Sequence, residues 1–372
     1  VMTTNPAFQR PMLIYWGRRG PMTQLARDLV QAGDEVGIHC SISLSQHNLG
    51  AANFRHLGSR LVDVPTFQQS WAIAAGVWRA ASAWRRLREG IIRNRSDCAV
   101  ILMPHVWSPL IVPRLKAAGI PVAVIIHDAR GHLGDATGQV NRWLLKAGYQ
   151  ADVVVTLSQV VSANLIASGF DRGNVHPLFH PDLAYSRPPF PEAGSQHPLR
   201  LLMFGRVLPY KGLWVCVDAL HQLRQRGVAF TATLVGEGDL GEQGERLRQL
   251  GVRVINRWVA DEEIAEIFAA HDAIVLTHVE ASQSGVIAAA SAQGLPAIVT
   301  PVGGLIEQVR HMETGLVAEA VSPEAVVRAI MLLANDRSLL QSLRAGLAAH
   351  AEERSPAVFL QAVLSALRVG AQ

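Results

Sequence analysis

Residues 200–212 read RLLMFGRVLPYKG and decide the fold of this chain. An apolar run typical of a buried strand comes first, and a loop that carries Gly205, Arg206 and Lys211 follows it. Helix-like periodicity over residues 213–226 comes next. A strand, a glycine-containing loop and a helix in this order begin a βαβ unit.

The same alternation extends on both sides of this segment. Short runs rich in Val, Ile and Leu predict strands at residues 12–16, 35–40, 98–103, 121–127, 152–157, 200–204, 230–235, 252–256, 273–276 and 296–300. Continuous apolar strands separated by helices indicate parallel sheets that are covered on both faces. We therefore expect an α/β protein made of doubly wound, Rossmann-like units.

A proline-rich interruption over residues 178–197 divides the pattern in two. Proline removes backbone donors and ends helices, so this segment is the natural boundary. We expect an N-terminal domain at residues 1–190, a C-terminal domain at 191–355 and a final helix at 356–372. Two such units in tandem predict a cleft, with ligands at the carboxyl ends of both sheets.

The composition of the 372 residues excludes several classes of protein. Hydrophobic residues make up 49% and charged residues only 17%, so the chain is too apolar to be disordered. The three cysteines are Cys40, Cys98 and Cys216, and their spacing fits neither a disulfide framework nor a zinc site. No apolar run is long enough to span a membrane. We expect a cytoplasmic protein.

Basic charge is concentrated in the first half of the chain. Residues 1–190 hold 19 Lys and Arg against 11 Asp and Glu, a balance of +8, whereas residues 191–372 hold 15 against 19. Within the first half, residues 71–95 interleave Trp71, Trp78 and Trp84 with several arginines. Such a helix suits an anionic membrane surface, or it is a surface helix whose tryptophans face the core. No nucleic-acid-binding module is present, so we expect no nucleic acid partner.

The second half contains three segments suited to an anionic ligand. Arg206 and Lys211 can hold a diphosphate beside a helix N-terminus, or they are two solvated loop charges. The segment LVGEGDL carries Gly236 and Gly238, which permit a tight turn after a strand. The segment 279–304 carries Glu280 and then the turn and helix start Ser282, Gln283, Ser284, Gly285 and Val286. That turn is either an anion cradle or a helix cap without a ligand.

In this order, the three segments resemble the nucleotide-binding half of the retaining family 4 glycosyltransferases, which have the two-domain GT-B fold. The resemblance covers most of residues 200–355. It implies that Arg206 and Lys211 hold the donor diphosphate and that Glu280 faces the transferred sugar. It also implies that Gly205, Gly236 and the turn 282–286 line the donor site, with Asn256, Arg257 and Trp258 beside the nucleotide base.

One position departs from the commonest family pattern. Many members carry a second glutamate eight residues after the first, and it binds the nucleotide ribose. Here that position is Ala288, followed by Ala289. A subgroup with an SQSGV-type turn resembles the chain more closely, but the ribose contact stays open.

The first half offers a polar cluster after a predicted strand. The segment VIIHDARGHLGD contains His127, Asp128, His132 and Asp135. These residues are a metal site, an acid–base group or a packed polar loop, and no further metal ligand is marked in the sequence. The resemblance makes His127 and Asp128 candidate catalytic residues that face Glu280 across the cleft.

The loop after the first predicted strand contains Gly17 and Gly20. It lacks the GxGxxG spacing of a dinucleotide site, so a dehydrogenase is not expected. It is an ordinary strand-to-helix turn or, in the glycosyltransferase interpretation, a loop that approaches the donor phosphates or the acceptor.

The resemblance, taken with these observations, implies a retaining hexosyltransferase that moves a sugar from a nucleotide diphosphate sugar to a glycan or lipid-linked acceptor in envelope polysaccharide biosynthesis. The resemblance implies no metal and no cofactor besides the sugar nucleotide. A GT-B sugar-nucleotide epimerase and a non-catalytic nucleotide-sugar-binding protein are the alternatives. Peripheral association with the inner face of the membrane is a further expectation.

Overall fold

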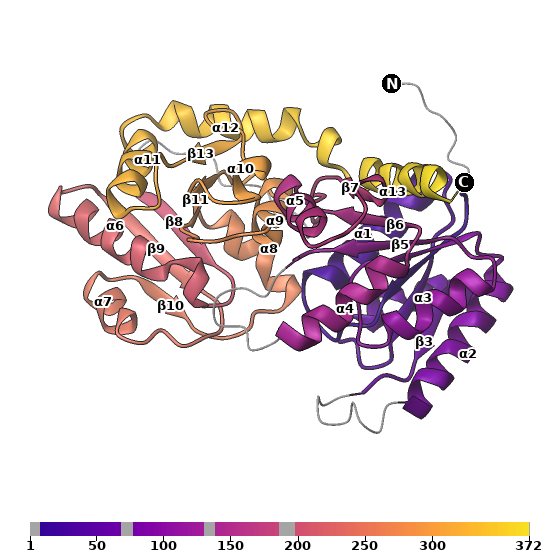
Figure 1. Cartoon of the computed structure of the whole chain (residues 1–372). Coiled ribbons are helices and arrows are strands. Elements are labelled where there is room, and N and C mark those ends of the chain that lie inside the picture. The colour runs from indigo at the N-terminus through magenta and orange to yellow at the C-terminus, as the bar shows by residue number, and fades with distance from the viewer. Residues whose placement is uncertain (1–7, 68–76, 130–137, 186–197, 372) are drawn as a thin grey trace. The chain divides into compact units, whose positions relative to one another are not determined.

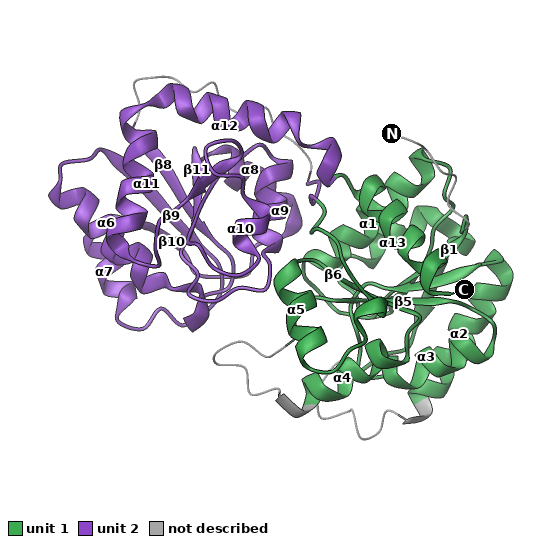
Figure 2. Cartoon of the chain, turned by 45° about the horizontal axis from the view of Figure 1, so that its top comes forward, with its two compact units in different colours: residues 1–131, 136–181, 355–372 green, residues 132–135, 182–354 purple. Residues whose placement is uncertain are grey.

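The computed structural model describes residues 8–67, 77–129, 138–185 and 198–371, with the backbone alone at residues 77, 78, 138 and 139. The chain divides into two compact units (Figure 2). Unit 1 comprises residues 1–131, 136–181 and 355–372, and unit 2 comprises residues 132–135 and 182–354.

Unit 1 is the part of the chain that carries α1 to α5 and α13 (Figure 1). In its described part, seven parallel strands form one sheet in the order β3-β2-β1-β4-β5-β6-β7. The strands are β1 (Pro11–Tyr15), β2 (Ser41–Ser45), β3 (Leu61–Val64), β4 (Cys98–Ile101), β5 (Val122–Ile126), β6 (Val153–Thr156) and β7 (Val175–Pro177). The helices are α1 (Pro21–Glu35), α2 (Val77–Asn94), α3 (Ser108–Ala117), α4 (Gly138–Gln150), α5 (Gln159–Ala167) and α13 (Pro356–Gly370), with the 3₁₀ turns η1 (Ala51–Arg60) and η3 (Arg172–Asn174).

In the described part of unit 2, six parallel strands form a sheet in the order β10-β9-β8-β11-β12-β13. The strands are β8 (Leu199–Phe204), β9 (Phe230–Val235), β10 (Arg253–Ile255), β11 (Ala273–Leu276), β12 (Ala297–Val299) and β13 (Gly315–Val317). The helices are α6 (Leu213–Gln225), α7 (Gln243–Gln249), α8 (Asp261–Ala269), α9 (Gly285–Ala292), α10 (Leu305–Gln308), α11 (Pro323–Asn335) and α12 (Arg337–Ala349), with the 3₁₀ turns η4 (Pro209–Lys211) and η5 (Glu352–Arg354).

Both sheets are buried between helices, which is why their strands read as continuous apolar runs. In unit 2, Leu201 of β8, Val217 of α6 and Ile330 of α11 are at most 1% exposed and belong to one core cluster. The strand order reverses between β1 and β4 and again between β8 and β11. These orders confirm the two doubly wound, Rossmann-like units expected from the sequence.

One predicted strand was wrong. The run at residues 35–40 lies where α1 ends and the chain turns at Gly37, and the strand follows it as Ser41–Ser45. Its alternating serines are buried, and neighbouring side chains satisfy the hydroxyls of Ser43 and Ser45. Trp16 donates to the Oγ of Ser43 at 3.0 Å, and Ser45 shares a hydrogen bond with Thr66 at 2.6 Å.

Among the described residues, the chain crosses from one unit to the other at residues 181/182 and 354/355. The boundary expected at residues 190/191 lies outside the described residues. Asp182 and Arg354, which begin and end the main segment of unit 2, are paired: the Nε of Arg354 donates to Asp182 at 3.0 Å. The expected C-terminal helix is α13, which packs against α1 and β6 and so belongs to unit 1.

Candidate functional site

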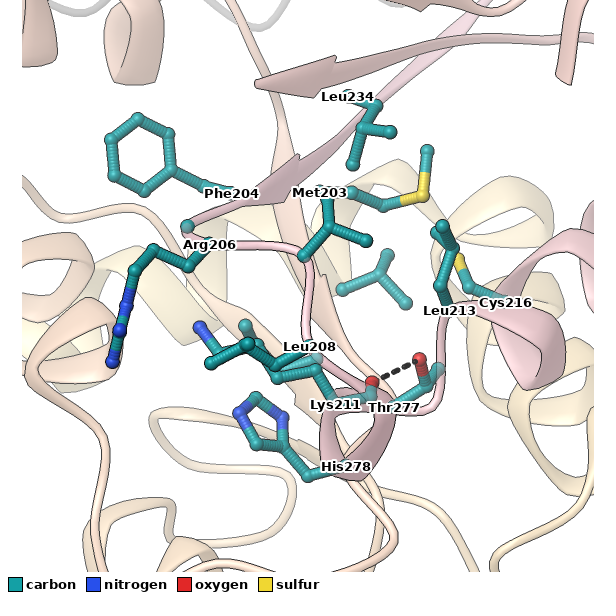
Figure 3. A pocket seen from close by; sticks show the side chains of 14 residues that line it. Met203, Phe204, Arg206, Leu208, Lys211, Leu213, Cys216, Leu234, Thr277 and His278 are labelled. Atoms are coloured by element: carbon teal, nitrogen blue, oxygen red, sulfur yellow. Dashed lines mark hydrogen bonds between the residues drawn. The ribbon is translucent and has the colours of Figure 1, made fainter. Parts of the chain in front are cut away.

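The candidate site is a pocket in unit 2 where the strand order of its sheet reverses. It opens at the carboxyl ends of β8 and β11, which is where doubly wound sheets bind ligands (Figure 3). The lining residues come from β8 and the loop after it, from β11 and its end, and from the start of α6: Met203, Phe204, Gly205, Arg206, Val207, Leu208, Lys211, Leu213, Cys216, Leu234, Val275, Leu276, Thr277 and His278.

Lys211 carries the main charge inside this pocket. Its side chain lies beside the imidazole of His278, while the exposed Arg206 reaches away from it (Figure 3). Burial, with a smaller contribution from the charge of Arg206, lowers the pKa of Lys211 to about 8. An enclosed ammonium group is poorly solvated, so an anion that enters the pocket interacts with it strongly.

The absence of a side chain at Gly205 lets two of the predicted segments meet. A Cβ on this residue would stand 2.8 Å from the Nζ of Lys211 and 3.4 Å from Val286 at the start of α9. Its φ of 109° also favours glycine. The structure therefore brings the basic loop and the start of the small-residue helix together.

Three loops at the carboxyl edge of this sheet are joined by hydrogen bonds, one between backbone groups and two from the side chain of Asn256. A Cβ on Gly236 would overlap the carbonyl oxygen of Gly205, so the loops after β8 and β9 run in close contact. Val207 N–H donates to the Glu237 carbonyl at 2.9 Å. Asn256 extends the arrangement to the loop after β10, because it accepts from the Gly238 N–H and donates to the Gly238 carbonyl, each at 3.0 Å.

The loop that carries Glu280 is held against the basic loop. The hydroxyl of Thr277 donates to the Gly212 carbonyl at 2.9 Å, and Val279 N–H donates to the Tyr210 carbonyl at 2.8 Å. The side chain of Glu280 is exposed directly after these anchors. The sequence interpretation did not single out Thr277 or His278, although their place after a predicted strand of a doubly wound sheet could have marked them.

The turn before α9 is held in a fixed shape. Ser284 caps the helix by accepting from the Ile287 N–H at 3.4 Å. Gln308 of α10 accepts from the Ser284 N–H at 2.7 Å and donates to its carbonyl at 3.0 Å. The side-chain oxygen of Gln283 is shielded from solvent and has no hydrogen-bond partner among the described residues. No sequence pattern pointed to Gln308, since it lies 24 residues away.

The other residues expected beside the nucleotide base lie at the end of the same sheet edge. Arg257 forms a bidentate ion pair with Glu263 of α8, at 2.9 and 2.6 Å. Trp258 is 39% exposed. Its ring is therefore accessible at the surface of unit 2.

In unit 1, His127 is buried at the carboxyl end of β5. Its Nε2 donates to the carbonyl oxygen of Leu102, the residue that follows β4, at 2.8 Å. Burial lowers the pKa of His127. The ring is thus a neutral imidazole near pH 7, and the hydrogen bond leaves Nδ1 as the acceptor nitrogen.

His132 and Asp135 lie outside the described residues, so the cluster expected around His127 is not described as a whole. Asp128 follows His127 and is partly exposed. Among the described residues, no group of three or more His, Cys, Asp or Glu side chains is arranged to hold a metal ion.

The loop between β1 and α1 contains Gly17 and Gly20. Asn48 fixes it by donating to the Gly17 carbonyl at 2.9 Å and to the Thr23 hydroxyl at 3.1 Å. Gly20, with φ at 113°, immediately precedes α1. The loop lies at the carboxyl end of β1, on the same sheet edge as His127.

The helix rich in Trp and Arg is α2. Trp84 is partly buried and packs against the core of unit 1, and Arg86 donates to the Asp63 carbonyl at 3.3 Å. The structure does not describe Trp71 or the side chain of Trp78. Within the described residues, none of the helices is both long and apolar enough to cross a membrane.

Two protein families match this sequence. Residues 198–336 match the family "Glycosyl transferases group 1", and residues 22–178 match the "Glycosyl transferase 4-like domain". The first match lies within unit 2, and the second lies almost entirely in unit 1.

Curated relatives match over part of their length. A D-inositol 3-phosphate glycosyltransferase of Jonesia denitrificans is 31% identical over 164 residues, which is 41% of this chain and 39% of the relative. The amylovoran biosynthesis glycosyltransferase AmsK of Erwinia amylovora is 29% identical over 147 residues, 37% of this chain and 36% of the relative. The matched regions thus span less than two fifths of each relative.

A solved structure matches nearly the whole chain. Anabaena Alr3699/HepE in complex with UDP-glucose superposes with a TM-score of 0.72 over 96% of this chain and 98% of the HepE chain, at 18% identity. A likeness at this identity concerns the fold, and it covers both units.

Proposed function

The chain belongs to the family 4 glycosyltransferases and has their GT-B fold, and from this premise we propose that it transfers a sugar from a nucleotide diphosphate sugar to an acceptor hydroxyl with retention of configuration. In such a transfer the bond from the sugar to the diphosphate breaks, a bond to the acceptor oxygen forms, and the acceptor hydroxyl loses its proton. The leaving diphosphate gains negative charge as the first bond breaks.

The observation that carries this proposal is the enclosed Lys211, with Arg206 beside it on the same loop. Both line the unit 2 pocket at the point where the strand order reverses. A poorly solvated cation stabilises growing negative charge more than a solvated one does, because the surrounding dielectric is low. Lys211 can therefore stabilise the leaving diphosphate without a metal ion, with the exposed Arg206 adding a second positive charge, and we propose that the enzyme needs no metal.

Further roles follow from the same proposal. Glu280 contacts the transferred sugar, and the turn 282–286 with its shielded Gln283 oxygen contacts the donor. The exposed ring of Trp258 and neighbouring Asn256 receive the base. From unit 1, His127 and Asp128 contribute to the reaction, with Gly17 and Gly20 in a loop that approaches the donor or the acceptor.

A ligand screen tests the donor part of the proposal. A compound present at 100 times its dissociation constant adds about 2.7 kcal/mol of apparent stability, which a thermal-shift assay detects easily. We expect at least one nucleoside diphosphate sugar to raise the melting temperature of the full chain. The same compound should leave the melting temperature of R206A/K211A unchanged. The control R248Q removes one exposed arginine of α7 and keeps the response. A panel without any stabilising sugar nucleotide contradicts the proposal.

Product analysis separates the proposed transferase from its alternatives. The missing second glutamate motivates a non-catalytic binder, because Ala288 and Ala289 are buried in α9 at 2% and 5% exposure and provide no carboxylate. A transferase consumes the sugar nucleotide only when an acceptor is present, an epimerase converts it without one, and a binder leaves it unchanged. A product with inverted anomeric configuration contradicts the retaining mechanism.

For the acceptor we propose a lipid-linked or glycan hydroxyl in envelope polysaccharide biosynthesis. The similarity to AmsK, named for amylovoran biosynthesis, supports this choice. We also propose that the enzyme works at the inner face of the membrane, to which the exposed arginines of α2 attach it. Because Trp84 packs against the core, we assign this attachment to the exposed arginines and not to Trp84.

A further inference from the structure

A second pocket of the protein lies in unit 1, at the opposite edge of the unit 1 sheet from the loops that carry Gly17 and His127. It is lined by residues that lie before or at the start of β1 and β2 or near the ends of α1, η1 and α2: Arg10, Asp34, His39, Ser41, Arg60, Arg93, Asn94 and Arg95. Its volume of about 620 Å³ is in the range of small-molecule sites. Since doubly wound sheets carry out their chemistry at the carboxyl ends of the strands, this pocket at the amino ends is separate from the proposed transfer site.

The pocket has an excess of positive charge. It is lined by four arginines and a single carboxylate, Asp34, and Arg60 neutralises that carboxylate in a bidentate pair at 2.6 and 2.8 Å. A second carboxylate, Asp97, lies next to the lining, where its Oδ2 accepts from the N–H groups of Gln9 and Arg10 at 2.7 and 2.9 Å. With both acids counted, two positive charges remain, apart from any charge on His39.

Two of the arginines are held in place. Arg60 also donates to the Cys40 carbonyl at 3.3 Å, and Arg93 donates to the Ser59 carbonyl at 2.9 Å. Asn94 donates to the same Ser59 carbonyl at 3.0 Å. These contacts fix one wall of the pocket before any ligand arrives, which reduces the entropy lost on binding.

The side chains of the other two arginines are available to bind a ligand. The exposed guanidinium groups of Arg10 and Arg95 have no hydrogen-bond or ion-pair partner among the described residues, although both line the pocket. A planar guanidinium donates two parallel hydrogen bonds to phosphate oxygens, and it does so more specifically than an ammonium group. Two unpaired guanidinium groups beside the fixed side chains of Arg60 and Arg93 are suited to a phosphate group and not to a neutral sugar.

We propose that this pocket binds a phosphate-bearing ligand, with Arg10 and Arg95 as its direct contacts. The phosphate comes from a soluble phosphorylated metabolite or from the headgroup of an anionic phospholipid. In either case the site anchors or regulates the enzyme and takes no part in sugar transfer.

Pyrophosphate binding by the full chain tests the proposal directly. The measurement uses isothermal titration calorimetry with inorganic pyrophosphate, in a background carrying R206Q/K211M so that the unit 2 pocket does not bind the probe. We expect R10Q/R95Q to weaken binding by at least about tenfold for each arginine, which is the effect of losing one of its two charge-assisted hydrogen bonds. The charge-matched control R142Q/R172Q removes two exposed arginines of unit 1 outside the pocket and retains full affinity.

Vesicle sedimentation distinguishes the two sources of phosphate. If R10Q/R95Q also loses binding to phosphatidylglycerol vesicles while R142Q/R172Q keeps it, the ligand is a lipid headgroup. If only the pyrophosphate affinity falls, the ligand is soluble. Equal behaviour of R10Q/R95Q and R142Q/R172Q in both assays overturns the proposal, whatever the outcome for sugar transfer.

Discussion

Replacing Lys211 with methionine removes a charge from the unit 2 pocket and keeps a side chain of similar length. We expect K211M to lose activity and, at the same time, to be more stable than the parent at pH 7. The reason is that burial lowers the pKa of Lys211 from 10.5 to about 8, which measures how poorly the pocket accommodates the ammonium group. At 1.36 kcal/mol for each pKa unit, keeping this group charged costs the folded protein about 3 kcal/mol.

The pH dependence of this difference follows from the protons bound by each state. Between pH 8 and pH 10.5 the unfolded chain retains a proton on Lys211 that the folded protein has lost. The free energy of unfolding of the parent therefore rises with pH through this window, whereas below pH 8 both states are charged and the full cost applies. The advantage of K211M should be about 3 kcal/mol at pH 7 and should disappear as the pH approaches 10.5.

Urea denaturation at pH 7, 9 and 10 measures this effect, with K146M as a control that removes an exposed lysine of α4. We expect K146M to follow the parent at every pH. A K211M protein that is less stable than the parent at pH 7, or whose stability difference is the same at pH 7 and pH 10, would refute the reasoning. Lys211 would then be a solvated loop residue, and the argument for an enclosed cation would fail.

Four further outcomes are expected. Arg206→Ala and Lys211→Ala should each lower turnover by about 100–1000-fold, as for the loss of one contact to developing charge, while R248Q stays near the parent in steady-state kinetics. Gly303→Ala should lower the free energy of unfolding by clearly more than Gly227→Ala, because both have a positive φ, but a Cβ at Gly303 would overlap the Ala281 carbonyl and a Cβ at Gly227 meets nothing within 4 Å; equal denaturation midpoints would contradict this. Gln308→Ala should weaken binding of the donor more than it lowers the free energy of unfolding, because the variant loses both hydrogen bonds that hold the Ser284 backbone at the donor turn. A titration with the sugar nucleotide measures this effect, with Gln225→Ala on the surface of α6 as the control. R85Q/R86Q/R88Q should sediment less with anionic vesicles and keep its donor affinity, since each cation near such a surface contributes about 1 kcal/mol, and sedimentation equal to that of the parent would argue for a soluble acceptor.

Local sequence was sufficient for the class of fold and for the order of its parts. The run before Gly205 predicted β8, and the small-residue segment predicted α9 to within one residue, at Gly285–Ala292. Where a strand breaks the apolar pattern, as in Ser41–Ser45, the sequence failed, because the buried hydroxyls of Ser43 and Ser45 are satisfied by Trp16 and Thr66 from other parts of the chain. The short strands β3, β7 and β13 were missed because pairing with neighbours, rather than composition, makes them strands.

The candidate residues of unit 2 were found from their motifs, but the reason they form a pocket lies in the tertiary structure. Sequence determined that Arg206 and Lys211 follow a strand and precede a helix, since apolar periodicity and glycine position are local properties. The pairing of β8 with β11 decided that Thr277 and His278 lie beside Lys211, and burial by those neighbours decided the pKa of its ammonium group. Likewise, Gln308 reaches the Ser284 turn only because α9 and α10 pack together. A residue's charge and local conformation can be inferred from its neighbours in sequence, whereas its solvation depends on which distant segments surround it, and only the folded chain determines that.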